Sequence, residues 1–342
     1  MLGGKRGLAL TSLGLVLFIV YLVYSNPLDA LMQLERFDVG LFLLSIVVND
    51  TGLLLFAVSW WVLLKAMGVG VRLSEAIQAT FISLFVVWMF PIPVGSEFIR
   101  AYLVRDKGNS SSGKAIASVV IHKTMYNVSF GAIIAVAAVV LTLVYGVEIP
   151  LRGDLLWLVL VFSVGSSILF AVILNTRALR WLYGHSPSFI RNRLEGSVDD
   201  SRLGLGDFDA LVDEIGSAVS SLRPKLFHSA TAFAMVAFQW STGSITAYLV
   251  SLSLGHPVDF WLIVIIYAMV EFVQQFNIFI PGGLGVIDAG LTGAFVLVGV
   301  PLSMASAISL LTRLVTYWFE VVVAGFVSFH YGFRESLKEY LE

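Results

Sequence analysis

The 342-residue sequence contains no cysteine and few charged residues. Without cysteine, disulfide bonds, thiol catalysis and cysteine-ligated zinc are excluded. Only 13% of the residues are charged, against about 25% in a typical soluble domain, so most of the chain cannot face water. The net charge of −2, without a basic stripe, argues against nucleic-acid binding. The five histidines lack the spacing of a zinc protease, and we expect neither a metal nor a cofactor.

Apolar residues, 58% of the chain, gather in runs as long as a membrane helix, which needs about 20 residues. The sequence therefore predicts an all-α polytopic membrane protein. The first run is followed by VYSNPLD, which lacks a signal-peptide cleavage pattern, so we interpret this run as a retained anchor. Six runs are long enough to span a membrane: 8–24, 39–66, 114–145, 155–174, 226–253 and 303–330.

Two further apolar stretches, 76–105 and 260–299, are each interrupted by proline and glycine. Backbone groups freed from a helix at membrane depth are tolerated only where protein buries them or a wet cavity meets them. Each stretch is therefore predicted to be a broken-helix, re-entrant hairpin at an internal site. For either break alone, a simple proline kink is the alternative. The hairpin residues are Pro91, Pro93, Gly95, Pro281, Gly282, Gly283 and Gly285.

The two breaks occupy equivalent positions in the chain. An offset of 190 residues places Pro91 on Pro281. The same offset places Lys123 on Arg313, each within the long helix that follows its break. Paired interruptions of this kind point to a transporter-type binding site between internal repeats. We predict two inverted repeats.

Lysine and arginine set the expected orientation, because cytoplasmic loops are enriched in both. With a cytoplasmic N-terminus, only Arg36 and Arg152 fall outside, three cations lie in apolar segments, and all the others face the cytoplasm. We predict a plasma-membrane protein with both termini cytoplasmic. Residues 1–342 would form a single membrane domain, with a first repeat half at 39–145 and a second at 226–330.

The hydrophilic stretch 175–225 separates the two halves. Helical spacing of its apolar residues predicts a cytoplasmic amphipathic linker helix, and a loosely ordered linker is the alternative. The apolar residues with this spacing are Phe208, Leu211, Val212, Ile215, Val219 and Leu222.

Ionisable residues inside the apolar segments are the strongest functional signal. A charge at the membrane centre costs roughly 2.5–3.5 kcal/mol, so eight facing lipid would cost on the order of 20–28 kcal/mol. They must face one another, a wet cavity or the membrane interface. The eight are Asp50, Glu97, Arg100, Lys123, Glu271, Asp288, Arg313 and Glu320.

Helical spacing groups several of these residues on shared faces. Arg313, Tyr317 and Glu320 follow i, i+4, i+7 on one helix, and Lys123 precedes Tyr126 by three residues on another. Arginine and lysine near exposed helix N-termini suit a phosphate or another anion. The alternative is that the charges only pin helices together, pairing Arg313 with Glu320 or Glu271, and Lys123 with Asp50 or Glu97.

Two segments carry a resemblance to a known family. PIPVGSEFIRAYLV and FIPGGLGVIDAGLTGAFVLVGVPLSMASAISLLTRLVTYWFEVVVAG resemble the flippase-like membrane region of lysylphosphatidylglycerol synthases and their free-standing relatives. The resemblance covers roughly 76–330 and is strongest over 280–326. It implies movement of aminoacylated phospholipids, isoprenoid-phosphate sugar carriers or related envelope lipids between leaflets.

The resemblance also implies roles for individual positions, with some departures. Its acidic residue after PGGxG is Asp288 here, where glutamate is more usual, and Lys123 stands where arginine is frequent. Its R-x-x-x-Y segment matches Arg313 and Tyr317. Its G-E-x-x-R segment matches Gly95, Glu97 and Arg100, with Ser96 inserted. The soluble aminoacyltransferase domain is missing from the sequence, so we expect no lysyl-lipid synthesis.

Together these patterns predict translocation of an anionic phospholipid or an isoprenoid-phosphate-linked sugar, without enzymatic activity. The expected partners are membrane lipids and a glycosyltransferase or lipid synthase. Two alternatives remain: a membrane-embedded lipid-phosphate glycosyltransferase, or an accessory subunit of a lipid or glycan assembly complex. The substrate-binding candidates are Arg100, Lys123, Arg313, Glu97, Asp288, Glu271, Glu320, Tyr317 and Tyr126.

Overall fold

The computed structural model is helical throughout its described residues, which contain no strand, and this confirms the all-α class. Most of the expected span 155–174 lies outside them, as do Pro91 and Pro93. The structure describes residues 4–32, 37–89, 95–108, 112–146, 161, 164–165, 167–168, 171–172, 174–188, 208–276 and 280–330.

Three helices in the described part of the chain are long and apolar enough to cross a membrane. They confirm the predicted spans at 39–66, 114–145 and 303–330, and the chain is an integral membrane protein. Helix α11 is as long as α3, with 28 residues each, but less apolar because serine and threonine line its buried face. The bounds are α3 (Val39–Ala66), α6 (Ser112–Val139) with η1 (Val140–Val144), α11 (Leu226–Ser253), and α14 (Leu302–Arg313) with η3 (Leu314–Phe319) and α15 (Glu320–His330).

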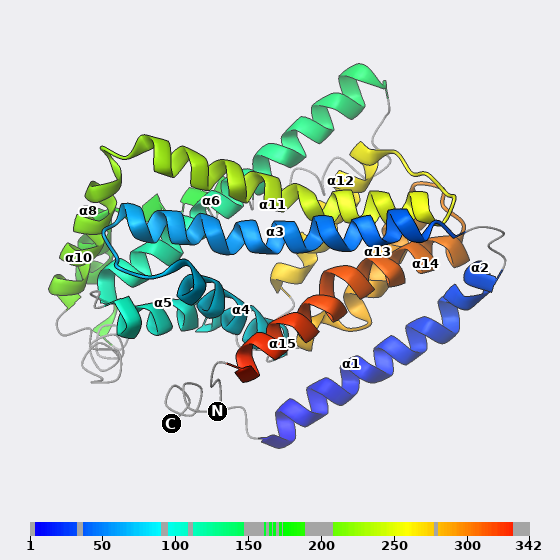
Figure 1. Cartoon of the computed structure of the whole chain (residues 1–342), viewed down its shortest axis with the longest axis horizontal. Helices are drawn as coiled ribbons and strands as arrows, with labels where there is room; N and C mark the ends of the chain where they lie inside the picture. The colour runs from blue at the N-terminus through cyan, green and yellow to red at the C-terminus, as the bar shows by residue number, and fades with distance from the viewer. Residues whose placement is uncertain are drawn as a thin grey trace.

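Helices α3 and α11 lie antiparallel along the centre of the bundle (Figure 1). At one end, Asp38 N–H donates to the Ser253 carbonyl at 2.9 Å. At the other end, Lys225 Nζ donates to the Ala66 carbonyl at 2.6 Å. Between these ends, Gly52 lies so close to Thr242 that a Cβ at Gly52 would overlap the threonine side chain. Small residues let two membrane helices approach closely, so this contact sets the distance between α3 and α11.

Replacing Gly52 with alanine is expected to lower the free energy of unfolding by about 1–3 kcal/mol, because the new methyl group overpacks the α3–α11 contact. Unfolding curves in mixed detergent and SDS would measure the change. Gly290→Ala is the matched control, since nothing lies within 4 Å of a Cβ there. If the two variants unfold at the same denaturant concentration, the close approach at Gly52 contributes nothing to stability.

Two pairs of shorter helices contain the interruptions expected from the sequence. In the first pair, α4 ends at Met89 and α5 begins at Gly95. In the second, α12 ends at Phe276 and α13 begins at Val286, with a short 3-10 turn between them. The second break is therefore seen as a non-helical turn over residues 280–285, whereas residues 90–94 of the first lie outside the described residues. The bounds are α4 (Leu73–Met89), α5 (Gly95–Gly108), α12 (Phe260–Phe276), η2 (Pro281–Gly283) and α13 (Val286–Leu297).

The first helices of the chain lie along one side of the bundle. Helix α1 (Gly4–Ser25) contains the apolar run 8–24, and α2 (Pro27–Met32) follows it (Figure 1). Tyr21 Oη lies 2.9 Å from Thr292 Oγ1 of α13. Helix α1 therefore rests on the second helix pair.

The linker between the halves contains two helices, α8 (Thr176–His185) and α10 (Phe208–Leu222), at one end of the bundle (Figure 1). The helical spacing predicted for 208–222 is present, and the buried side of α10 packs against α6. Glu214 of α10 accepts a hydrogen bond from Gly113 N–H of α6 at 2.7 Å. This contact satisfies a free backbone donor in the first turn of α6. The buried residues of α10 are Val212, Ile215, Ala218 and Leu222.

Candidate functional site

The second break is built from glycines in a backbone conformation that other residues rarely adopt. Gly282, Gly283 and Gly285 have φ angles of 57°, 66° and 78°. Tyr317 packs directly on Gly282, where a Cβ would overlap its ring. At Gly285, a Cβ would lie 2.6 Å from the backbone nitrogen of Phe18 in α1. The break therefore requires glycine for its backbone angles and for its close neighbours.

An ion pair between Asp288 and Arg313 stabilises this break. Arg313 Nε lies 3.3 Å from Asp288 Oδ1, and Arg313 Nη2 donates to the Gly282 carbonyl at 2.6 Å. Asp288 Oδ2 also accepts from Gly285 N–H at 2.9 Å, so this carboxylate caps α13. Both side chains are buried, with Asp288 at 0% and Arg313 at 5% exposure. Arg313 is thus tied to both sides of the turn.

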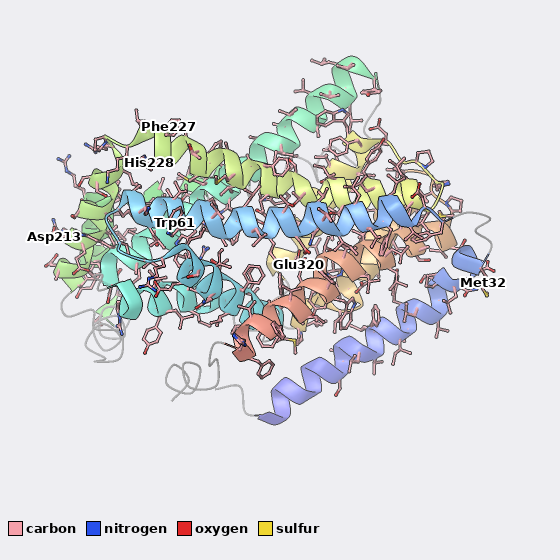
Figure 2. All side chains as sticks on the ribbon, viewed as in Figure 1. Met32, Trp61, Asp213, Phe227, His228 and Glu320 are labelled. Carbon is pink, nitrogen blue, oxygen red and sulfur yellow. The ribbon has the colours of Figure 1, made fainter. Side chains whose placement is uncertain are left out.

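Glu320 has a different partner from the one that helical spacing suggested. Its Oε1 accepts a hydrogen bond from Asn49 Nδ2 of α3 at 2.5 Å. Figure 2 places Glu320 near the middle of the bundle, at the start of α15. The ion-pair partner that the structure gives Arg313 is Asp288, and Glu320 lies within electrostatic range of Arg313. The π-helical turns of η3 lie between the two residues, so the i, i+7 spacing of a regular helix does not hold there.

Glu271 of α12 connects the two halves electrostatically. Its carboxylate lies within electrostatic range of Arg313 in the second half and of Lys123 in the first. One turn earlier on α12, Tyr267 lies against Gly243 of α11, where a Cβ would overlap its ring. Ionisable groups far apart in the sequence are therefore close neighbours inside the bundle.

Arg100 forms a second buried cluster, in the first half. It is 2% exposed, and its guanidinium carbon lies over the rings of Trp60 and Phe56 at 4.9 Å and 5.3 Å from their centroids. Its Nη1 lies 3.2 Å from His122 Nδ1, and His122 Nε2 lies 2.7 Å from Ser59 Oγ. Cation–π contacts of this kind stabilise a cation at low solvent exposure. Helices α3, α5 and α6 meet at this cluster.

Lys123 and Tyr126 lie beside the Arg100 cluster on α6. Lys123 Nζ is 5.0 Å from the centroid of the Tyr126 ring. The centroid of the Tyr126 ring in turn lies 6.1 Å from that of Phe56 and 5.4 Å from that of Trp240. A row of aromatic rings therefore runs from the Arg100 cluster toward α11.

The structure brings most of the predicted residues into these neighbouring clusters. Asp288, Arg313 and Tyr317 meet at the second break, and Glu271 interacts with both Arg313 and Lys123. Helix α5 begins at Gly95, whereas the side chain of Glu97 lies outside the described residues. That any of the predicted residues binds a ligand stays a prediction.

Sequence reasoning missed two polar residues of the Arg100 cluster, Ser59 and His122. His122 lies within the predicted span 114–145 and is ionisable, yet only Asp, Glu, Lys and Arg were counted as membrane charges. Including histidine in that count would have found it. Ser59 gives no comparable signal, because serine is tolerated singly in membrane helices.

The sequence matches a known protein family. The family model named Lysylphosphatidylglycerol synthase TM region matches residues 10–324. The chain belongs to this family. The matched range contains both breaks and all eight ionisable residues of the apolar segments. Membership agrees with the resemblance stated above and supports a lipid-related role in the membrane.

Two relatives extend this similarity over nearly the whole chain. A UPF0104 membrane protein of Pyrococcus horikoshii is 22% identical over 325 residues, which cover 92% of this chain and 93% of that protein. A UPF0104 membrane protein of Methanothermobacter thermautotrophicus is 20% identical over 318 residues, or 92% of each chain. The chain is therefore similar to membrane proteins of about its own length.

Proposed function

We propose that the protein translocates an anionic phospholipid or an isoprenoid-phosphate-linked sugar across the plasma membrane. The observation that carries this proposal is the set of charged side chains buried inside the bundle, in particular the Asp288–Arg313 ion pair at the second break and Arg100 in the first half. A polar headgroup needs such groups at membrane depth, because lipid cannot solvate its charge. In this proposal the two breaks are re-entrant hairpins of two inverted halves, and both termini are cytoplasmic.

The cations would bind the headgroup phosphate, and the carboxylates would compensate their charge when no lipid is bound. Arg100 and Arg313 are each buried at 5% exposure or less, so they can interact with an anion more strongly than surface cations can. The lipid tail would remain in the bilayer while the headgroup passes between the halves. A lipid gradient, an ion gradient or removal on the far side would drive the net movement.

Leaflet-to-leaflet movement in proteoliposomes tests the proposal. Purified protein would be compared on a fluorescent phosphatidylglycerol, a phosphatidylcholine and an isoprenoid phosphate. We expect faster movement of the acidic lipids than of phosphatidylcholine. Movement of all three at the rate of empty liposomes would contradict translocation. Product formation with a nucleotide sugar, or stable association with one enzyme, would then favour the glycosyltransferase or accessory-subunit alternative.

Lys123→Gln should reduce the translocation rate of the acidic lipids by about tenfold, because a hydrogen bond to a charged group is lost. The rate for phosphatidylcholine should change little. Lys65→Gln is the matched control, since Lys65 is an exposed lysine at the end of α3. Equal rates for both variants and the wild type would remove Lys123 from the transport path.

A further inference from the structure

His122 occupies an unusual position for a histidine inside a membrane helix. Its side chain is completely buried, and its ring centroid lies 4.5 Å from that of Phe56. Both ring nitrogens are within hydrogen-bond distance of polar side chains, Arg100 on one side and Ser59 on the other. The ring therefore connects α5 to α3 through α6.

The direction of each hydrogen bond in this chain is fixed by chemistry. A guanidinium can only donate, so His122 Nδ1 must accept from Arg100 and carries no proton. The ring is then neutral, with its proton on Nε2, and Nε2–H donates to Ser59 Oγ. The Ser59 hydroxyl in turn donates to the Phe56 carbonyl at 2.8 Å. Each member of the chain thus determines the proton position of the next.

This arrangement restricts the guanidinium of Arg100 in two ways. The rings of Trp60 and Phe56 contact it and limit where it can lie. The guanidinium can rotate within its own plane and still keep its contact with the aromatic rings. The hydrogen bond to His122 Nδ1 allows only one such rotation, because one N–H must point at the ring nitrogen. Orientation matters for phosphate recognition, since arginine binds phosphate through paired, parallel N–H groups.

We propose that His122 is a positioning residue: bonded to Ser59 through Nε2–H and accepting through Nδ1, it orients the Arg100 guanidinium toward the acidic headgroup of the translocated lipid. This inference rests on the proposed function and adds a role for two residues that the sequence did not single out. His122 does not touch the lipid in this arrangement and acts only through Arg100. Ser59 acts one step further away, by fixing the proton on Nε2.

Two substitutions of His122 separate its two hydrogen bonds. In His122→Asn, the amide oxygen replaces Nδ1 as an acceptor for Arg100. In His122→Gln, the amide nitrogen replaces Nε2 as a donor to Ser59, and the acceptor at the δ position is lost. Translocation of phosphatidylglycerol and phosphatidylcholine would be measured in proteoliposomes, together with the melting temperature in detergent. Thr124→Ala is the control on the same helix, because its hydroxyl bonds only within α6, to the Val120 carbonyl.

We expect His122→Asn to keep the wild-type preference for phosphatidylglycerol within about threefold. His122→Gln should lose that preference by about tenfold, with an unchanged rate for phosphatidylcholine, as for loss of one charged hydrogen bond. A purely structural role would lower both rates equally and lower the melting temperature. Equal preference in both variants and the wild type would overturn the positioning role while leaving translocation intact.

Ser59→Ala decides the question if His122→Gln fails to fold. Without the Ser59 hydroxyl, Nε2–H of His122 loses its acceptor, so the ring is no longer held in the orientation in which Nδ1 accepts from Arg100. The preference for phosphatidylglycerol should then fall by about threefold or more. Wild-type preference in Ser59→Ala would overturn the proposal. If wild-type protein moves no lipid at all, the proposed function and this inference both fail, and the wild-type measurement alone reveals that case.

Discussion

Asp288→Ala is expected to lower the free energy of unfolding by about 3–5 kcal/mol, the largest effect of any single substitution at the second break. The variant leaves Arg313 as a charge at 5% exposure without its carboxylate, and such an uncompensated buried charge is strongly destabilising. It also removes the acceptor for Gly285 N–H, and losing a helix cap costs about 1 kcal/mol. Unfolding in SDS and the yield of folded protein in detergent would measure the loss.

Two further variants separate the charge from the cap. Asp288→Asn keeps an oxygen that can accept from Gly285 N–H, so its loss of stability reports the charge. The double variant Asp288→Leu/Arg313→Met removes both charges, and it should recover most of the stability lost in Asp288→Ala. If the double variant is as unstable as Asp288→Ala, the ion pair is not the reason for the loss.

The two buried arginines of the proposed transport path have different contacts. Arg313 pairs with Asp288 and donates to a backbone carbonyl of the turn, so it also stabilises the second break. Arg100 is held by aromatic faces and by a neutral histidine. We therefore expect substitutions of Arg313 to reduce stability, because they leave Asp288 as a buried charge without its cation.

Much of the fold could be predicted from the sequence, because membrane helices follow from the length and composition of apolar runs. The three confirmed spans lie within two residues of their predicted bounds. The break after Ile280 could be predicted because proline and glycine interrupt an apolar run there, whereas residues 90–94 lie outside the described residues. The inverted relation of the two halves and the orientation of the termini stay predictions.

The partners of the charges could be predicted only as a set. The argument from solvation requires buried charges to face inward, and Arg100, Asp288, Arg313 and Glu320 are indeed buried. Which charges form a pair depends on how α13 and α14 are aligned where they pack together. No local sequence pattern determines that alignment. Asp288 precedes Arg313 by 25 residues, so its pairing could not be found from spacing on one helix.

The linker illustrates a similar limit. The spacing of apolar residues in 208–222 predicts a helix with one apolar side, but the pattern is the same for a lipid surface and for a protein surface. In the structure, Val212 and Ile215 are buried, and Glu214 bonds to Gly113 of α6. The apolar side of α10 is therefore used against the protein.

Gly282→Ala is expected to cost about 2–4 kcal/mol of unfolding free energy, from two separate causes. The backbone at Gly282 has a φ of 57°, and a left-handed conformation costs a non-glycine residue about 1–2 kcal/mol. The added methyl group would also overlap the Tyr317 ring, and overpacking of a well-packed site costs about 1–3 kcal/mol. The guanidinium carbon of Arg313 lies 4.4 Å from the centroid of the Tyr317 ring, so moving the ring would disturb the cation as well.

A matched glycine and a double-mutant cycle separate the two causes. Gly68→Ala has a φ of 78° with nothing within 4 Å of a Cβ, so its cost reports backbone strain alone. In a Tyr317→Ala background, Gly282→Ala should cost no more than Gly68→Ala does, because the overlapping ring is gone. A cost that stays as large without Tyr317 would mean that the turn tolerates only glycine for its backbone. The ring would then have no part in the requirement for glycine.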